Sequence, residues 1–153
     1  MVGFFNEAYI IPGMLKIKRL TKDLPLPKKV HSTDAGIDLY SAVYWTLEPG
    51  EKHWIPTGII LEFPVGYFGM IVPRSGLAEE GISIVNSPGI VDEGFTGEVK
   101  AILINQGNQN YYVQRGDRIA QLIIRKQYDF TIQEVDELTE TDRGNEGFGS
   151  SGV

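Results

Sequence analysis

Short runs in which apolar and polar residues alternate recur along the chain, as expected for half-buried β-strands. The run at 14–20 (MLKIKRL), for example, alternates apolar and basic side chains. Turns that contain glycine and proline, such as Glu48-Pro49-Gly50, separate these runs. The pattern predicts strands over residues 14–20, 36–45, 53–63, 66–72, 82–85, 97–105, 111–114 and 118–126.

Helices have little support in this pattern. Ser75 is placed to cap one short helix over residues 75–80, and residues 136–142 allow a brief helical turn. The sequence therefore predicts an all-β domain, a jelly-roll-like distorted barrel of mostly antiparallel strands. One short helix follows the segment Pro73-Arg74-Ser75-Gly76 in this prediction.

The two ends of the chain differ in composition from the middle. We expect an N-terminal extension at 1–13, a β domain at 14–142 and a mobile C-terminal tail at 143–153. The extension is either an extra strand that packs on a neighbour or a disordered segment. The tail, rich in glycine and serine, is either a frayed solubilising end or a segment that orders over a ligand. In the second case Arg143 would bind phosphate and Phe148 would stack on a ring.

Composition and charge narrow the function. The chain has 153 residues, 42% of them hydrophobic and 22% charged, which is typical of one globular domain. Cysteine is absent, so disulfides, thiolate zinc sites and a cysteine nucleophile are excluded. The net charge of −6 argues against nucleic-acid binding, although a local basic pocket can still bind free polyphosphate. No apolar run or basic leader predicts a membrane or export segment, so we expect an intracellular protein, cytoplasmic or, in a eukaryotic or viral setting, nuclear.

The segment PRSGLA at 73–78 follows a predicted apolar strand and begins the predicted helix. Free backbone N–H groups, the Ser75 hydroxyl and the Arg74 guanidinium would then point to one place, which suits a phosphate. The alternative is an ordinary helix cap with a surface arginine.

The segment GIVDEGFTG at 89–97 resembles a β-hairpin with a carboxylate and an aromatic ring at its tip. Asp92 follows the apolar pair Ile90-Val91, so we expect it near the core. A carboxylate beside bound phosphates can accept a proton from an attacking water. The alternative is that Asp92 only stabilises its own turn.

Several further polar residues are candidates for structural roles. Residues 117–118 are expected to serve a turn and a local ion pair, while His31 and His53 show no metal-ligand spacing. Gln121 is a lone amide in an apolar run and needs partners in the core or on a ligand. Asp38, the fourth residue of AGIDLYS, is weak evidence by itself.

Taken together, five segments resemble the motifs of the homotrimeric dUTPase family (deoxyuridine 5′-triphosphate nucleotidohydrolases). Their order and spacing are also similar, and the resemblance covers residues 15–152. The segments are AGIDLYS at 35–41, PRSGLA at 73–78, GIVDEGFTGEV at 89–99, RGDRIAQLII at 115–124 and RGNEGFGSSG at 143–152.

The resemblance implies a jelly-roll-like fold, a homotrimer with active sites shared between subunits, and Mg²⁺-dependent hydrolysis of dUTP to dUMP and pyrophosphate. This reaction limits the incorporation of uracil into DNA and supplies dUMP for dTTP synthesis. Asp92 would orient the water that attacks the α-phosphorus, and Asp38 would support the site indirectly. The implied phosphate-binding residues are Arg74, Ser75, Gly76, Gln121, Arg143, Gly149 and Ser150. The implied uracil and deoxyribose contacts are Asn86, Gly89, Ile90, Val91, Phe95, Lys100 and Phe148. Mg²⁺ would be held by substrate phosphates and waters, with no direct protein ligand.

Two positions depart from the family pattern. Phe95 stands where the family usually has tyrosine, and Glu146 stands where a small residue is common. Two other functions remain open. One is a dCTP deaminase, which resembles dUTPases in fold but would need a glutamate base in the 89–97 region. The other is a nucleotide-gated binding protein that engages a regulatory partner.

Overall fold

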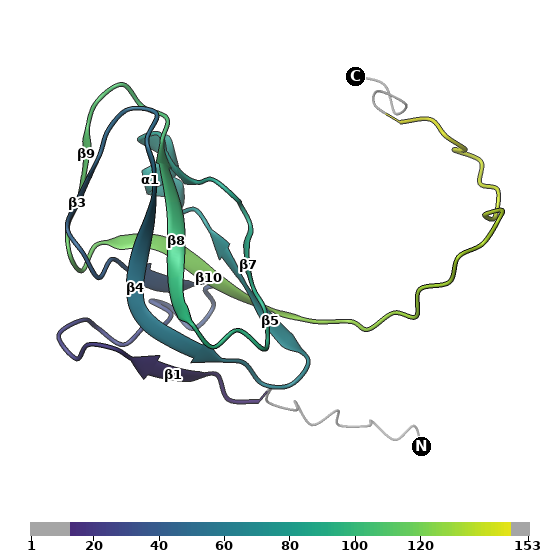
Figure 1. Ribbon diagram of the computed structural model, residues 1–153, viewed down its shortest axis with the longest axis horizontal. Coiled ribbons are helices and arrows are strands. Elements are labelled where there is room, and N and C mark those ends of the chain that lie inside the picture. Colours follow the sequence, from purple (N-terminus) through teal and green to yellow (C-terminus); the bar gives the residue numbers. More distant parts are fainter. Residues whose placement is uncertain (1–12, 148–153) are drawn as a thin grey trace, which may run out of the picture.

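The computed structural model describes residues 13–147, and these residues form an antiparallel β structure with one short helix (Figure 1). The predicted extension at 1–13 lies almost wholly outside the described residues. The strands are β1 (Lys16–Arg19), β2 (Ile37–Tyr40), β3 (Trp45–Leu47), β4 (Lys52–Glu62), β5 (Tyr67–Val72), β6 (Ile82–Ile84), β7 (Gly89–Val91), β8 (Glu98–Asn105), β9 (Tyr111–Val113) and β10 (Arg118–Lys126). The helix is α1 (Ser75–Glu79).

Two four-stranded sheets and a two-stranded ribbon make up the body. The first sheet has the order β1-β4-β8-β6, the second has the order β2-β10-β5-β7, and β3 pairs with β9. The predicted all-β, mostly antiparallel class is confirmed, and within residues 13–147 the sheets stay open rather than closing into a barrel. Side chains of both sheets form one core, because the strands alternate inward and outward positions. The core includes Leu39, Ile55, Leu103, Ile119 and Leu122, each at most 1% exposed.

The strands and the helix differ from the prediction at three places. The predicted strand at 36–45 is divided into β2 and β3, because the buried Ser41 hydroxyl bonds to the Val43 backbone and bends the chain. Ser75 is the first helical residue rather than the cap; Arg74 occupies the N-cap position, and no side chain caps the helix. The predicted helical turn at 136–142 does not form.

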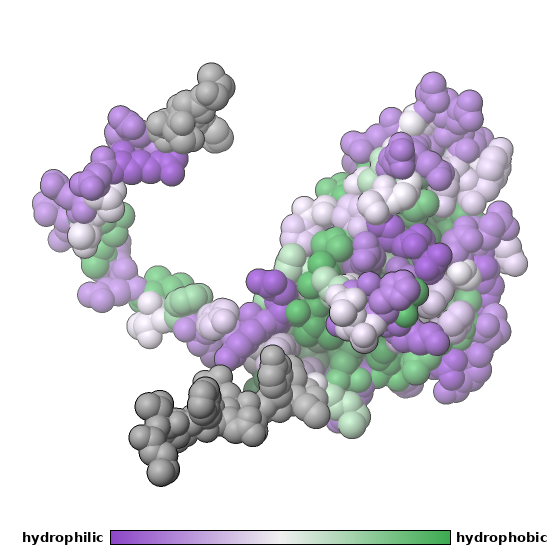
Figure 2. All heavy atoms as spheres, turned by 180° about the vertical axis from the view of Figure 1, so that it is seen from behind, coloured by the Kyte–Doolittle hydropathy of each residue, from purple (hydrophilic) through white to green (hydrophobic). Residues whose placement is uncertain are grey.

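Residues 127–147, which we call the C-terminal arm, extend from the end of β10 away from the body (Figure 1). The arm is neither helix nor strand, yet its first half alternates exposed apolar residues with polar ones. Tyr128, Phe130 and Ile132 are 67%, 82% and 96% exposed. Figure 2 shows apolar side chains along the arm and on the body near the root of the arm. A segment that exposes several large apolar side chains to water in this way typically packs on another molecule.

Candidate active site

A pocket of about 370 Å³ lies between β7 and β8, and we call it the β7–β8 pocket. Its lining includes each described residue for which uracil or deoxyribose contacts were predicted: Asn86, Gly89, Ile90, Val91, Phe95 and Lys100. Asp92 lines the same pocket. The sequence analysis missed Trp54, which also lines it and whose ring centroid lies 5.9 Å from Lys100 Nζ.

The pocket exists because β7 and β8 are not paired with each other. β7 pairs with β5 in one sheet, whereas β8 pairs with β4 and β6 in the other. The predicted hairpin at 89–97 is therefore wrong, and the loop at 92–97 crosses from one sheet to the other. β7 is an edge strand of its sheet, so its outer N–H and C=O groups are available to a planar base.

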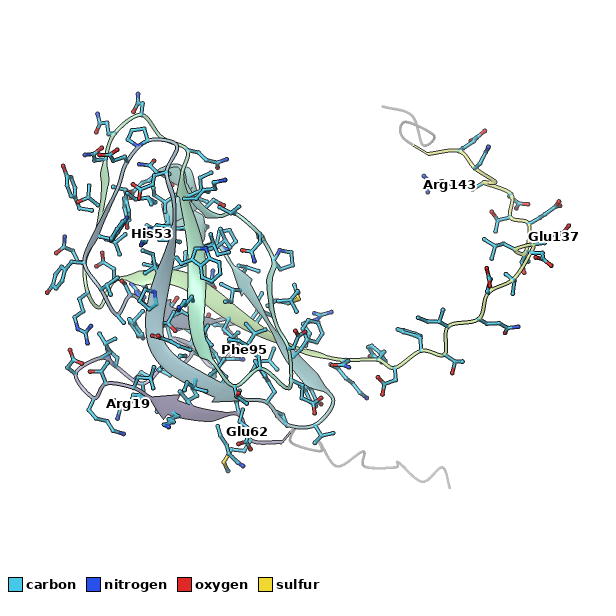
Figure 3. The ribbon with its side chains drawn as sticks, viewed as in Figure 1. Arg19, His53, Glu62, Phe95, Glu137 and Arg143 are labelled. Carbon is cyan, nitrogen blue, oxygen red and sulfur yellow. The ribbon has the colours of Figure 1, made fainter. Side chains whose placement is uncertain are left out.

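Asp92 lies at the end of β7, where the crossing loop begins. Its side chain is exposed, so the expectation that it lies near the core is wrong. The Phe95 N–H donates a 3.1 Å hydrogen bond to the Asp92 carbonyl, which closes a tight turn. This turn brings the 45%-exposed Phe95 ring to the same pocket (Figure 3).

A second pocket of about 310 Å³ lies beside α1, and we call it the α1 pocket. It brings together four residues predicted to bind phosphate: Arg74, Ser75, Gly76 and Gln121. Asp38 and Arg118 also line it. The Gln121 amide donates a 3.2 Å hydrogen bond to the Pro73 carbonyl, which fixes that side chain against the start of the PRSG segment.

Asp38 holds two arginines in the α1 pocket. Its carboxylate accepts from Arg74 Nε at 3.2 Å and from Arg118 Nη1 at 3.3 Å, and the residue is only 8% exposed. Two guanidinium groups share this single carboxylate, so each keeps N–H groups that an anion can accept from, although the Asp34 carboxylate also lines the pocket. The expected local ion pair of residues 117–118 is wrong, because Arg118 instead pairs with Asp38. Only the register that places β2 beside β10 reveals this contact.

The two pockets lie on opposite faces of one sheet. Adjacent strand residues point to opposite faces, and in β5 Ile71 lines the β7–β8 pocket. Val72 faces a groove that shares Asp38 and Gln121 with the α1 pocket. The β7–β8 and α1 pockets have no lining residue in common. Within one chain, therefore, the two sets of predicted contacts do not surround a single cavity.

Arg143 lies on the C-terminal arm, clear of the body and of Phe95 (Figure 3). Its Nε donates a 2.9 Å hydrogen bond to the Glu146 carbonyl. The predicted contacts Phe148, Gly149 and Ser150 lie outside the described residues.

Two further properties of the described part bear on its function. Across residues 13–147, no three His, Asp or Glu side chains come together in a metal-binding group. No helix in that part of the chain is long and apolar enough to cross a bilayer.

Comparison with known proteins identifies the family. The dUTPase family model matches residues 22–152. The chain belongs to the dUTPase family. Its members hydrolyse dUTP to dUMP and pyrophosphate, so the predicted enzyme class, a dUTP diphosphatase, is confirmed.

Similar proteins agree with this assignment over nearly the whole chain. The deoxyuridine 5′-triphosphate nucleotidohydrolase of Mycolicibacterium vanbaalenii is 49% identical over 149 residues, covering 93% of this dUTPase and 97% of that protein. The corresponding protein of Corynebacterium glutamicum is 47% identical over 140 residues, covering 90% and 94%. A solved structure of the Staphylococcus bacteriophage 80alpha dUTPase with dUpNHpp has a TM-score of 0.85 and 31% identity, covering 92% of this chain and 99% of that one.

Proposed function

We propose that this dUTPase hydrolyses dUTP in sites shared between the subunits of a homotrimer. The base and sugar bind in the β7–β8 pocket of one subunit, and the triphosphate binds in the α1 pocket of a neighbour. The observation that carries this proposal is the separation of the two pockets on opposite faces of one sheet, with no residue in common. A second subunit is then needed to complete each site.

Uracil recognition is assigned to the open edge of β7 and to the part of β8 around Lys100, which lies outside the stretch 103–105 that pairs with β6. Backbone groups at Ile90 and Lys100 present a fixed pattern of donors and acceptors to the base edge. Cytosine would place an exocyclic amine where uracil has a carbonyl, so a backbone donor there rejects it. Asn86 and Gly89 complete the wall of the pocket, and Gly89 lets the Asn86 amide approach, since an added Cβ would lie 3.2 Å from Asn86 Nδ2.

The phosphate chain is assigned to the α1 pocket and to the C-terminal segment. Arg74, Ser75, Gly76 and Gln121 supply a guanidinium, a hydroxyl, a free backbone N–H and an amide. Phosphoryl transfer depends mainly on such positioning and on neutralising charge. The tail residues Arg143, Phe148, Gly149 and Ser150 would close over the nucleotide, with Arg143 on the γ-phosphate and Phe148 stacked on uracil.

The activation of the reacting water is assigned to Asp92. The carboxylate accepts a proton as the water oxygen forms a bond to the α-phosphorus. The bond from the α-phosphorus to the bridging oxygen breaks, and pyrophosphate leaves with that oxygen. The products are dUMP and pyrophosphate, as for the family.

Mg²⁺ fits this arrangement without a protein cage. Mg²⁺ keeps several waters and binds well to substrate phosphates, and no metal-binding carboxylate cluster occurs in residues 13–147. When bound with the triphosphate, the ion would neutralise phosphate charge. A variant of the dUTPase of phage phi11 of S. aureus, 26% identical, has been described with a structural Mg(II) ion.

The C-terminal arm gives a second reason for a shared site. Its alternating apolar side chains are exposed within one chain, and the arm carries Arg143 away from both pockets of its own subunit. Packing the arm on a neighbour would bury these side chains and bring Arg143 to a site. In a closed three-subunit ring, every arm packs on a neighbouring subunit and every site is completed in the same way.

Product analysis tests the catalytic assignment. Wild type and Asp92→Asn are incubated with Mg²⁺ and with dUTP, dCTP, dTTP or UTP separately. We expect dUMP and pyrophosphate from dUTP alone, with a loss of at least about 100-fold in Asp92→Asn and with dUTP binding retained. Ammonia release from dCTP would favour the deaminase. Binding of dUTP without turnover by wild type would favour the nucleotide-gated binding protein.

Subunit mixing tests the shared site. Asp92→Asn and Arg74→Gln subunits are co-expressed with different tags, and mixed oligomers are purified. In a mixed trimer one of the three sites combines an intact Asp92 with an intact Arg74 of the neighbour. The purified mixed trimers should therefore show about a third of wild-type activity. Inactive mixtures, or an active monomer by light scattering, would contradict the proposal.

A further inference from the structure

The loop that carries Asp92 is tied to the body through the next residue, Glu93. The Gly66 N–H donates a 2.9 Å hydrogen bond to Glu93 Oε2. Gly66 lies in the turn between β4 and β5 with a φ of +82°, a left-handed conformation that favours glycine. The half-buried Glu93 thus joins the catalytic loop to a turn 27 residues away along the chain.

The same glycine contacts the root of the C-terminal arm on its other side. The Gln127 N–H donates a 2.7 Å hydrogen bond to the Gly66 carbonyl. Gln127 is the first residue after β10, where the arm begins. Gly66 therefore links the Asp92 loop on one side with the start of the arm on the other.

We propose that Glu93 is a positioning residue for dUTP hydrolysis, which holds the Asp92 loop on the Gly66 turn and so couples it to the root of the arm. Glu93 does not line the β7–β8 pocket, whereas Asp92 and Phe95 do, so it acts through its neighbour. The hydrogen bond between Phe95 N–H and the Asp92 carbonyl is internal to the loop and does not tie it to the body. This inference rests on the proposed role of Asp92.

The physical reason is the strict geometry of general-base catalysis. The carboxylate must stay within hydrogen-bond reach of the attacking water, and a misplacement of about 1 Å can lower the rate about 100-fold. Because Asp92 is exposed, its own surroundings restrain it weakly. The anchor at Glu93 is one residue away and fixes the direction in which the loop leaves β7.

The first experiment compares Glu93→Ala, Glu93→Gln and the control Glu48→Ala, a loss of an exposed glutamate in the turn after β3. We expect Glu93→Ala to lower kcat about tenfold with KM changed less than about twofold. Glu93→Gln keeps an oxygen that accepts from Gly66 and should stay within about twofold of wild type. Hydrogen exchange of the Gly66 amide should be faster in Glu93→Ala only.

Two outcomes would overturn the positioning role. One is wild-type kcat in Glu93→Ala. The other is equal losses in Glu93→Ala and Glu93→Gln, which would mean that the charge rather than the hydrogen bond matters. Either result is distinct from failure of the proposed function, for which Asp92→Asn would have to stay active.

A double-mutant cycle tests the link to the arm. Gln127→Pro removes the N–H that donates to the Gly66 carbonyl. The preceding residue, Lys126, is already in a strand, which is the conformation preferred before a proline. Gln127→Ala keeps the N–H and is the control. We expect Gln127→Pro to lower kcat, and its combination with Glu93→Ala to lower it less than the product of the two single effects. A multiplicative result, or equal kcat in the two Gln127 variants, would overturn the coupling.

Discussion

The Asp38 carboxylate, on β2, lies 3.2 Å from Nε of Arg74, which directly precedes α1. The two residues are 36 positions apart, and in the sheet β10 lies between β2 and β5, the strand that precedes Arg74. Because Asp38 also accepts from Arg118, it sets the direction of both guanidinium groups in the α1 pocket. A carboxylate that acts through two arginines would thereby control the proposed phosphate site.

Asp38→Asn should weaken nucleotide binding more than it slows the chemical step. The asparagine amide would place an N–H group against a guanidinium, so at least one arginine loses its anchor. We expect KM for dUTP to rise about tenfold, which corresponds to about 1.4 kcal/mol, with a smaller change in kcat. Steady-state kinetics checks this. The charge-matched control is Glu62→Gln, which removes the carboxylate of the exposed ion pair between Glu62 and Lys16. An unchanged KM would contradict the role.

Asn105→Ala should destabilise the fold without altering the site. Asn105 is 1% exposed; its Nδ2 donates to the carbonyls of Leu47 and Gln109, and its Oδ1 accepts from the Gly107 N–H. Alanine would leave these backbone groups unpaired, at a cost of about 3 kcal/mol in the free energy of unfolding. Urea unfolding at fixed protein concentration measures the loss. The exposed neighbour variant Asn108→Ala should stay within about 0.5 kcal/mol of wild type.

The ion pair of Asp23 and Arg115 should make stability depend on pH in the acid range. The Arg115 guanidinium donates to both carboxylate oxygens, at 2.8 and 2.9 Å, and holds the pKa of Asp23 well below its usual range. A lowered folded-state pKa adds stability above the unfolded pKa of about 3.9 and loses it as pH falls toward the folded value. The difference in Tm between wild type and Asp23→Asn should be full above about pH 5 and shrink below about pH 4. A difference that grows on acidification would contradict the assignment.

Phe95 should still exclude ribonucleotides. The ring lines the β7–β8 pocket and keeps the apolar face that a tyrosine would present to the sugar. We expect kcat/KM for dUTP to exceed that for UTP by at least about 100-fold, and Phe95→Tyr to change this ratio little. Comparable turnover of UTP and dUTP by wild type would refute the prediction, and Phe95→Ala should lower the ratio.

Much of the candidate site is recognisable from short segments of the sequence. The described contacts expected at the base pocket all lie within residues 86–100, and three of the four expected at α1 lie within residues 74–76, so proximity in the chain already groups most of them. Local spacing assigns Arg118 a partner close by in the chain, whereas its true partner Asp38 is 80 residues away. Periodicity reports which face of a strand is buried, but it does not report which strand lies alongside.

The sequence by itself determined the all-β class and the approximate positions of most strands, because these depend on local alternation and turn residues, and its five short motifs carried the resemblance to the dUTPase family. Only the tertiary structure decided that β7 and β8 belong to different sheets, which opens the pocket between them. It also decided that the two pockets face opposite sides of one sheet and that Gly66 joins the Asp92 loop to the arm. These features arise from strand pairing between residues far apart in the chain, whose energy depends on the packing of the whole core rather than on any local segment.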